Sequence, residues 1–476
     1  MQSSKEKSLD DLKLRLAVYD RPSSLRKDGR RVFVHPADVS GRFTRLRHIL
    51  FYILIAIWAV LPWIHVGGRP AVFLDVPRRR FFFFGYSFDA TSFWLVWFVL
   101  TGVLFGLVFM TAILGRAWCG YACPQTVFLE GVYRKIERWV EGNRNERIAL
   151  DQAPMSWDKL WRRLVKHFLY ILVSLFISHM FVAYFVSMPS LLEMMTRPPW
   201  EHPYAFAWCF GVGAILYGNF AWFREQLCLV ICPYGRLQSI LLDDDSLVVG
   251  YDEKRGEPRK KGKPKEGEVR GDCIDCGRCV AVCPTGIDIR NGLQVDCIAC
   301  AQCIDACDEV MKKIGKQPGL VRYDSLRGLR GEVRRFFRPR IAFYVLIGIL
   351  LYGSGFALCL SQPRVEARIV RLRGLPFFVE GNTVRNAFEV HLINDSDWKR
   401  TFRIHAAVNG GEGSVRIGDE ETAVKLVELD GWKDGRVTVV VRTPLEKERA
   451  GKELKVKVEA DGDQKILSAP LLGPNN

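Results

Sequence analysis

The sequence of 476 residues lacks the signatures of several common protein classes. It contains no dinucleotide-binding fingerprint and no Walker sequence, so direct binding of NAD or ATP is not expected. Gly211, Gly213 and Gly218 lie inside an apolar run and are interpreted as sites of helix packing. No cleavable signal peptide is expected, because residues 1–45 are polar and precede the first apolar run.

The charge of the chain is unbalanced, with 68 basic and 52 acidic residues and a formal net charge of +16. The basic residues stand in blocks beside apolar stretches, which is the positive-inside pattern of a membrane protein. Nucleic-acid binding is therefore not expected, and membrane lipid is the expected surrounding.

Apolar runs of about the length that a bilayer core requires predict transmembrane helices. We expect five of them, at about 49–66, 93–114, 168–188, 205–223 and 341–360. The basic flanks place the N-terminus on the cytoplasmic side of a bacterial inner membrane and the C-terminal segment on the periplasmic side. Arg78, Arg79 and Arg80 disagree with this orientation but are outweighed by the other basic segments.

Two cysteine-rich runs follow the fourth apolar run, each with the spacing C-x2-C-x2-C-x3-C. A zinc site would leave the third cysteine of each run unused, and disulfides between such close residues would be strained. The spacing is typical of two [4Fe–4S] clusters, in which the fourth cysteine of each run binds the other cluster. The predicted ligands are Cys273, Cys276, Cys279 and Cys307 for one cluster, and Cys297, Cys300, Cys303 and Cys283 for the other.

A second set of cysteines forms two C-x3-C-P motifs, each directly after a predicted span: Cys119 with Cys123, and Cys228 with Cys232. In a helix, residues i and i+4 share a face, and the proline ends or kinks the helix. The repeat predicts that the four sulfurs converge at one depth on the cytoplasmic surface. A third iron–sulfur cluster, a Cu(I) site and a redox-active thiol pair are all compatible with these ligands.

Other side chains are weaker candidates. Cys209 and Cys359 are interpreted as small buried hydrophobes, and His179 is a polar group in a predicted span with either a functional role or a helix-packing role. An external copper-passing site could be built from the thioethers and imidazole of Met188, Met194, Met195 and His202, although packing is the more common role of methionine.

Beyond residue 365, apolar and polar residues alternate with period two between turn residues, which predicts a β-sandwich. This segment contains no cysteine, so the predicted sandwich has no inter-sheet disulfide. The expected fold class is thus a membrane α-helical protein with a ferredoxin-like two-cluster domain and an immunoglobulin-like sandwich. The expected segments are a cytoplasmic arm (1–45), a four-helix transmembrane region (46–240), a linker (241–272), the two-cluster domain (273–310), a basic juxtamembrane segment (311–340), the fifth transmembrane helix (341–361) and the periplasmic sandwich (365–476).

Together, the five spans, the two C-x3-C-P motifs, the two cluster runs and the sandwich resemble the cytochrome c oxidase accessory protein family, CcoG, also called FixG or RdxA. The resemblance covers nearly the whole chain. It implies a cupric reductase that converts Cu(II) to Cu(I) for assembly of the copper centre of cbb3-type oxidase. On this hypothesis Cys119, Cys123, Cys228 and Cys232 hold the copper.

The implied partners are the oxidase assembly machinery or copper carriers, and an unidentified cytoplasmic electron donor; a homo-oligomer is compatible with the sequence. Two rival functions remain open. One is a quinol-linked electron relay to another reductase, and the other is a non-enzymatic assembly factor that uses the sandwich to hold an oxidase subunit.

Overall fold

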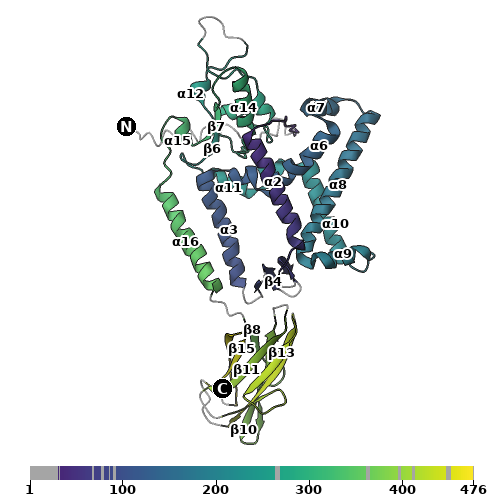
Figure 1. Ribbon diagram of the computed structural model, residues 1–476, viewed down its shortest axis with the longest axis vertical. Coiled ribbons are helices and arrows are strands. Elements are labelled where there is room, and N and C mark those ends of the chain that lie inside the picture. Colours follow the sequence, from purple (N-terminus) through teal and green to yellow (C-terminus); the bar gives the residue numbers. More distant parts are fainter. Residues whose placement is uncertain are drawn as a thin grey trace. The chain divides into compact units, whose positions relative to one another are not determined.

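The computed structural model describes most of the chain (Figure 1). The described residues are 31, 33–66, 69–76, 80–84, 86–88, 93–262, 269–360, 365–394, 398–409, 413–431, 433–445 and 452–474. They form two compact units, the first covering most of the chain up to Gly353 and the second holding the C-terminal part from Ser354. Part of the expected arm and residues 361–364 lie outside the described residues.

Among the described residues, five helices are long and apolar enough to cross a membrane, as the sequence predicts. Only 11% to 39% of the most apolar window of each helix is buried inside the protein, so most of these side chains face outward, as lipid-facing side chains do. The helices are α2 (Arg42–Val60), α3 (Phe93–Leu114), α8 (Trp157–Val186), α10 (Pro203–Gly218) and α16 (Pro339–Leu360).

Two of these helices begin earlier than the apolar runs predict. Helix α2 begins with a basic turn at Arg42, and helix α8 begins at Trp157, where the Ser156 hydroxyl accepts a hydrogen bond from the Lys159 amide. Such a cap satisfies an amide that the helix itself leaves unpaired. The helices therefore extend past the apolar core into polar surroundings.

Shorter elements connect the long helices. After α2 come η1 (Leu61–Trp63) and the short strands β1 (His65–Val66), β2 (Arg69–Pro70), β3 (Val72–Asp75), β4 (Arg80–Phe83) and β5 (Tyr86–Phe88). After α3 come α4 (Ala117–Tyr121), α5 (Pro124–Phe128), the π-helical turn η3 (Leu129–Tyr133), α6 (Arg134–Glu141) and α7 (Arg144–Gln152). After α8 comes α9 (Met188–Thr196), and after α10 come the π-helical turns η4 (Asn219–Phe223) and η5 (Leu227–Ile231) and helix α11 (Pro233–Leu241).

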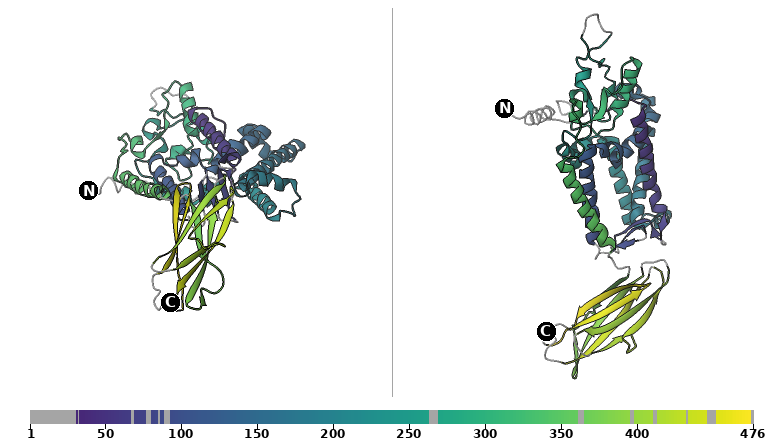
Figure 2. Two further views of the ribbon diagram at one scale, coloured as in Figure 1. Left: turned by 60° about the horizontal axis from the view of Figure 1, so that its bottom comes forward. Right: turned by 60° about the vertical axis from the view of Figure 1, so that its left-hand side comes forward.

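The cysteine-rich segment gathers at one end of the long helices of the first unit, and Figure 2 shows the same from a second side. Its elements are β6 (Val248–Tyr251), α12 (Glu253–Gly256), α13 (Arg278–Ala281), η6 (Ile289–Asn291), α14 (Gln302–Lys313), β7 (Val321–Asp324) and α15 (Leu326–Leu329). Strands β6 and β7 pair antiparallel and pack on the cysteine loops.

This pairing joins two segments that the sequence predicts to be connections. The expected linker 241–272 contains β6 and α12, and the expected juxtamembrane segment 311–340 contains β7 and α15. Each strand contains only four residues, so the two strands, which lie far apart in the sequence, form a sheet only by pairing with each other. The cluster region therefore extends well beyond the cysteine runs.

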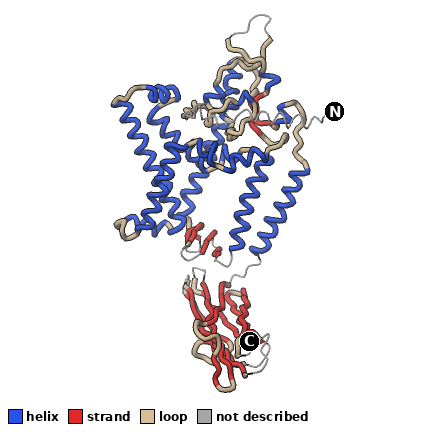
Figure 3. The backbone as a smooth tube through the Cα atoms, turned by 180° about the vertical axis from the view of Figure 1, so that it is seen from behind, coloured by secondary structure: helices blue, strands red, loops and turns tan. Residues whose placement is uncertain are grey.

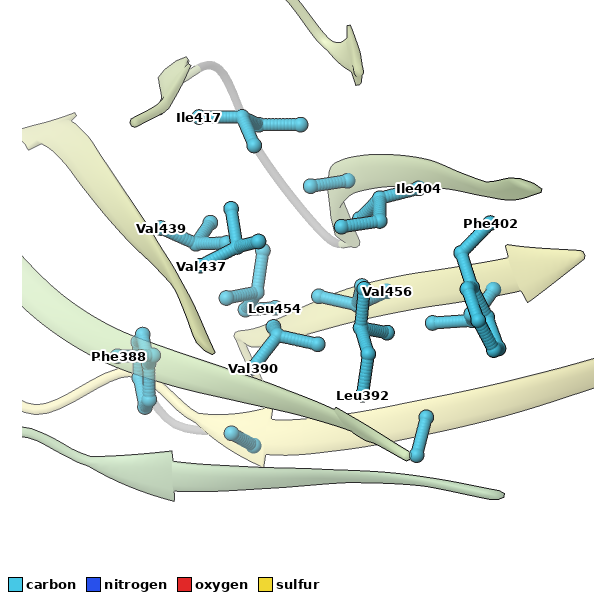
Figure 4. Packing of buried hydrophobic residues seen from close by; sticks show 14 of the residues in the cluster. Phe388, Val390, Leu392, Phe402, Ile404, Ile417, Val437, Val439, Leu454 and Val456 are labelled. Atoms are coloured by element: carbon cyan, nitrogen blue, oxygen red, sulfur yellow. The ribbon is translucent and has the colours of Figure 1, made fainter. Parts of the chain in front are cut away.

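The second unit is the β-sandwich that the period-two pattern predicts. One sheet has the order β12-β14-β10-β8, with β9 paired to β10, and the other has the order β13-β11-β15-β16. Figure 3 shows the strands of this unit in red. In Figure 4, alternate residues of one sheet, such as Phe388 and Val390, point into the same core as Phe402 and Ile404 of the facing sheet. The strands are β8 (Glu366–Arg371), β9 (Phe378–Glu380), β10 (Thr383–Ile393), β11 (Arg400–Asn409), β12 (Ser414–Ile417), β13 (Val424–Leu429), β14 (Asp434–Pro444), β15 (Glu453–Ala460) and β16 (Asp463–Pro470).

Candidate functional site

The eight cysteines of the two runs line two small cavities. One cavity is lined by Cys273, Cys276, Cys279 and Cys307. The other is lined by Cys283, Cys297, Cys300 and Cys303, together with Cys279. The first cavity thus receives three cysteines of the first run and one of the second. The other receives three cysteines of the second run and two of the first. We call them the distal cavity (Cys273 group) and the proximal cavity (Cys297 group).

The cysteine loops curl because four of their residues adopt the left-handed backbone conformation. The two loops repeat this feature at matching positions, with Asp275 and Gly277 in the first loop and Ala299 and Ala301 in the second, all with φ between 51° and 66°. Such a conformation costs a non-glycine residue roughly 1–2 kcal/mol. Strain of this kind is kept at functional sites, and it turns the Ala299 amide toward the Cys297 sulfur at 3.4 Å.

The residues of both cavities fit iron–sulfur clusters. The proximal cavity is closed by apolar side chains such as Val249, Ile287 and Ile289, and burial raises the pKa of the Cys297 thiol to about 12. Burial also raises the pKa of Cys279 and of Cys307 to about 12. Without metal these thiols are neutral at pH 7, whereas bound iron takes them as thiolates. Metal binding therefore releases protons and holds the loops together.

The prolines of the C-x3-C-P motifs begin helices rather than end them. Pro124 is the first residue of α5 and Pro233 the first of α11. The second cysteine of each motif, Cys123 or Cys232, is the extended residue before that helix. The expectation that i and i+4 share one helix face is thus wrong in detail. Proline favours the first helical position because it needs no amide partner there.

The four thiols of these motifs nevertheless lie near enough for their charges to interact. We call Cys119, Cys123, Cys228 and Cys232 the membrane-edge quartet. The charges of Cys119, Cys123 and Cys232 raise the pKa of Cys228, and the charge of Cys232 also raises the pKa of Cys119 and Cys123. Burial is the largest cause and raises the pKa of Cys119 to about 11 and that of Cys228 to about 12.

Within the described part of the chain, no three His, Cys, Asp or Glu side chains come close enough together to hold a single metal ion. This finding speaks against a three-sulfur site for one ion in the membrane-edge quartet. It does not bear on the two cavities, because each cysteine of a [4Fe–4S] site binds a different iron. Of the external copper-passing candidates, Met188 is buried in an apolar cluster with Leu191, and His202 is the residue before α10.

The quartet lies directly against the loop of the proximal cavity. A Cβ atom added to Gly120 would lie 2.7 Å from the carbonyl oxygen of Ile298 and 2.9 Å from that of Ala299. The neighbouring Tyr121 hydroxyl lies 3.3 Å from the Tyr323 hydroxyl. Only glycine allows this approach, which places the residue after Cys119 in contact with the loop between two predicted cluster ligands.

Arg116 joins the quartet to the cluster region. Its guanidinium donates to the Gln238 amide oxygen at 3.0 Å, to the Cys297 carbonyl oxygen at 2.9 Å, and to the Gly235 carbonyl oxygen. Cys119 donates to the same Gln238 oxygen at 3.1 Å. The sequence singled out Arg116 only by its place before the motif, and Gln238 carried no signal because its partners lie more than 100 residues away.

Three remaining candidates have structural explanations. The Nδ1 atom of His179 lies 2.7 Å from the Leu175 carbonyl oxygen of the same helix, so the imidazole is satisfied by its own backbone. Cys209 is buried in an apolar cluster, as expected. Gly213 packs within 3.1 Å of Leu175, whereas an added Cβ at Gly211 or Gly218 meets nothing within 4 Å, so the packing interpretation is wrong for those two. The side chain of Cys359 lies outside the described residues.

Comparison with family models finds two iron–sulfur matches and one match to the sandwich. A "4Fe-4S binding domain" model matches residues 95–143, which include the first C-x3-C-P motif. A "4Fe-4S dicluster domain" model matches residues 223–326, which include the second motif and both cysteine runs. The model "IG-like fold at C-terminal of FixG" matches residues 356–470.

Curated relatives match over most of their length. "Nitrogen fixation protein FixG" of Rhizobium meliloti is 36% identical over 78% of this chain and 78% of the relative. In Cereibacter sphaeroides, "Protein RdxA" is 37% identical over 86% of this chain and 89% of the relative, and "Protein RdxB" is 38% identical over 78% and 81%.

Proposed function

The chain belongs to the FixG/RdxA family of iron–sulfur proteins, and from this premise we propose that it reduces Cu(II) to Cu(I) for the copper centre of a cbb3-type oxidase. The proposal assigns the eight loop cysteines to two [4Fe–4S] clusters and the membrane-edge quartet to the copper substrate. The contact of Gly120 with Ile298 and Ala299 is the observation that carries it, because it sets soft sulfur donors beside a cluster loop.

The cysteines that line the two cavities would hold the [4Fe–4S] clusters, which would supply single electrons. Each Cu(II) ion takes up one electron and becomes Cu(I), so no bond is broken and no proton is consumed at the metal. Cu(II) prefers nitrogen and oxygen ligands, whereas Cu(I) prefers thiolates and thioethers. Reduction therefore increases the affinity of the ion for cysteine sulfur.

The surroundings of the quartet suit Cu(I) in two ways. The Arg116 guanidinium lowers the pKa of Cys119 against the larger opposing effect of burial, so a positive charge favours the thiolate there. A pair of soft sulfurs is sufficient for Cu(I), and the quartet contains two such pairs. This coordination does not need the three-donor group that the described residues lack.

We place the clusters and the quartet on the cytoplasmic side of the inner membrane and the sandwich on the periplasmic side. This proposal rests on the basic flanks of the five apolar helices. It assigns the sandwich to contact with the oxidase assembly machinery or a copper carrier, in keeping with its lack of cysteine and of any clustered histidines.

The test is copper reduction by the purified full-length protein under anaerobic conditions. Dithionite would reduce the clusters and would then be removed, because free dithionite reduces Cu(II) directly. Limiting Cu(II) would then be added, and a Cu(I)-specific chelator would report the product. Serine at all four quartet positions should abolish protein-dependent Cu(I) formation while iron and sulfide contents stay unchanged. The matched control is Cys209→Ser, a buried thiol in the apolar cluster formed with α8 and α9, which should leave the rate unchanged. Equal rates in the quadruple variant and the control would refute the copper assignment.

A further inference from the structure

A large polar cavity lies in the first unit, between α6, α7, α8 and α10. Its volume is about 500 Å³, within the usual range of small-molecule sites. His35, Tyr170, Tyr217 and Trp222 line it along with charged side chains. Tyr217 and Trp222 belong to the last turns of the fourth apolar segment, so the cavity lies at the polar end of a membrane-spanning helix.

The charges on the cavity wall cancel. Three acidic and three basic side chains line it, and each acid is paired with a base. The pairs are Glu137 with Arg224 at 2.8 Å, Glu141 with Lys166 at 2.6 Å, and Asp151 with Arg163. A charged ligand would have to break one of these pairs. The wall therefore suits a neutral polar ligand, and the aromatic side chains suit a ring.

Two histidines on this wall are held in place for proton transfer. The Nε2 atom of His35 lies 2.8 Å from an Asp151 carboxylate oxygen, and its Nδ1 atom is buried without a hydrogen-bond partner among the described residues. The His35 side chain is only 14% exposed. On the opposite helices, the Nδ1 atom of His167 lies 3.0 Å from the Tyr217 hydroxyl.

The Asp151 carboxylate fixes the role of His35. Its hydrogen bond with His35 and the nearby Arg163 lower the pKa of Asp151 to about 2, so it remains ionised. An ionised acceptor holds the proton on Nε2 and leaves Nδ1 as an acceptor. A ligand hydroxyl that approaches Nδ1 would thus meet a nitrogen atom that is free to accept its hydrogen bond.

A chain of buried ion pairs connects the cavity to the proximal cluster loop. Arg224, which pairs with Glu137 on the cavity wall, is followed by Glu225, and the Glu225 carboxylate lies 3.3 Å from the Arg134 guanidinium. Arg134 donates to the Pro284 carbonyl oxygen at 3.1 Å. Pro284 follows Cys283, a predicted ligand of the proximal cluster. The cavity and the cluster loop therefore share one rigid polar network.

We propose that this cavity binds a membrane hydroquinone and that its oxidation supplies the electrons for copper reduction; the second half of this inference rests on the proposed function. One hydroquinone loses two electrons and two protons and becomes a quinone. The protons pass to His35 and His167, and then to solvent through the neighbouring carboxylates. The two electrons leave singly and reduce two Cu(II) ions to two Cu(I) ions, so charge and atoms balance.

The experiment uses the full-length protein with oxidised clusters in phospholipid nanodiscs, without oxygen. Duroquinol is added, and cluster reduction is followed by optical bleaching and EPR. The unmodified protein should be reduced, and His35→Gln should slow the reaction at least about 100-fold, because a positioned general base contributes that much or more. The matched control is His179→Gln on α8, whose imidazole contacts the Leu175 carbonyl oxygen instead of the cavity.

Binding is read separately, with a photoreactive azidoquinone whose cross-links are mapped by mass spectrometry. Labelling should fall on peptides that contain Tyr217 or Trp222 and should disappear when duroquinol competes. Dithionite should still reduce the clusters of His35→Gln at the unmodified rate, which excludes misfolding as the cause of its defect.

Three results would overturn the inference. The first is that dithionite reduces the clusters but duroquinol does not. The second is that duroquinol reduces the clusters of His35→Gln and His179→Gln at equal rates. The third is that duroquinol does not displace the azidoquinone label, as expected if phospholipid occupies the cavity. A protein that accepts electrons from duroquinol but forms no Cu(I) would instead refute the copper proposal and leave the cavity assignment standing.

Discussion

Substituting Gly120 by alanine tests the contact between the membrane-edge quartet and the proximal cluster loop. The added Cβ would lie 2.7 Å from the Ile298 carbonyl oxygen, and ordinary contact begins at 3.4 Å, so the two backbones must separate by about 0.7 Å. Both sides are backbone, which cannot turn away as a flexible side chain does. Overpacking of this kind costs about 1–3 kcal/mol.

The expected result is a lower melting temperature and slower electron transfer from the clusters to Cu(II). The helical position of Gly120 works in the opposite direction, because alanine in a helix is favoured over glycine by roughly 1 kcal/mol. Gly211→Ala is the control, since it gains the same helical preference and its Cβ meets nothing within 4 Å. The assays are thermal unfolding in detergent and Cu(I) formation by protein that dithionite has reduced and that is then freed of excess dithionite. If Gly120→Ala matched Gly211→Ala in both, the close approach would not exist.

Three further predictions follow from the cavities and the buried ion pairs. Cys307→Ser and Cys273→Ser should change the EPR signal of one cluster, and Cys283→Ser and Cys297→Ser should change the signal of the other. If the effects grouped by sequence run instead, the cavity assignment would be refuted. Glu137→Gln, which leaves the buried Arg224 without its carboxylate, should lower the free energy of unfolding by about 3–5 kcal/mol. The control Glu309→Gln, at an exposed pair with Lys313, should cost at most about 1 kcal/mol. Although burial opposes ionisation, Arg224 and its basic neighbours lower the pKa of Glu137 to about 2. The contribution of Glu137 to the free energy of unfolding is therefore present above pH 4.5 and is lost as the pH falls toward 2. In thermal melts at several pH values, Glu137→Gln should show no such loss over that range.

The parts that the sequence predicts well are those with a local or periodic signal. Four closely spaced cysteines define each loop, and runs of about twenty apolar residues define the five long helices. Alternation defines β10 and β14 of the sandwich. These signals depend on residues that are neighbours in the chain. Fold class and family follow from them.

The parts that the sequence does not predict depend on contacts between distant residues. Strands β6 and β7 contain four residues each and are separated by about seventy residues, so neither has a recognisable period alone. Gln238 contacts Cys119 and Arg116 across more than 100 residues, and Asp151 contacts His35 across 116. A single polar residue carries no sign of such a partner. The contacts of Gln238 with Cys119 and Arg116, and the polar cavity, therefore became visible only in the structure.

The central claim is that electrons held by the two cysteine-loop clusters reduce copper at the membrane-edge quartet. The direct measurement is a single turnover without oxygen, in which protein with reduced clusters is freed of excess reductant and mixed with Cu(II). Cluster reoxidation and Cu(I) formation are recorded together. We predict one Cu(I) for each cluster electron lost, at equal rates, and no such coupling when serine replaces Cys119, Cys123, Cys228 and Cys232. Cu(I) that forms while the clusters stay reduced, or coupling that survives the four substitutions, would contradict the account.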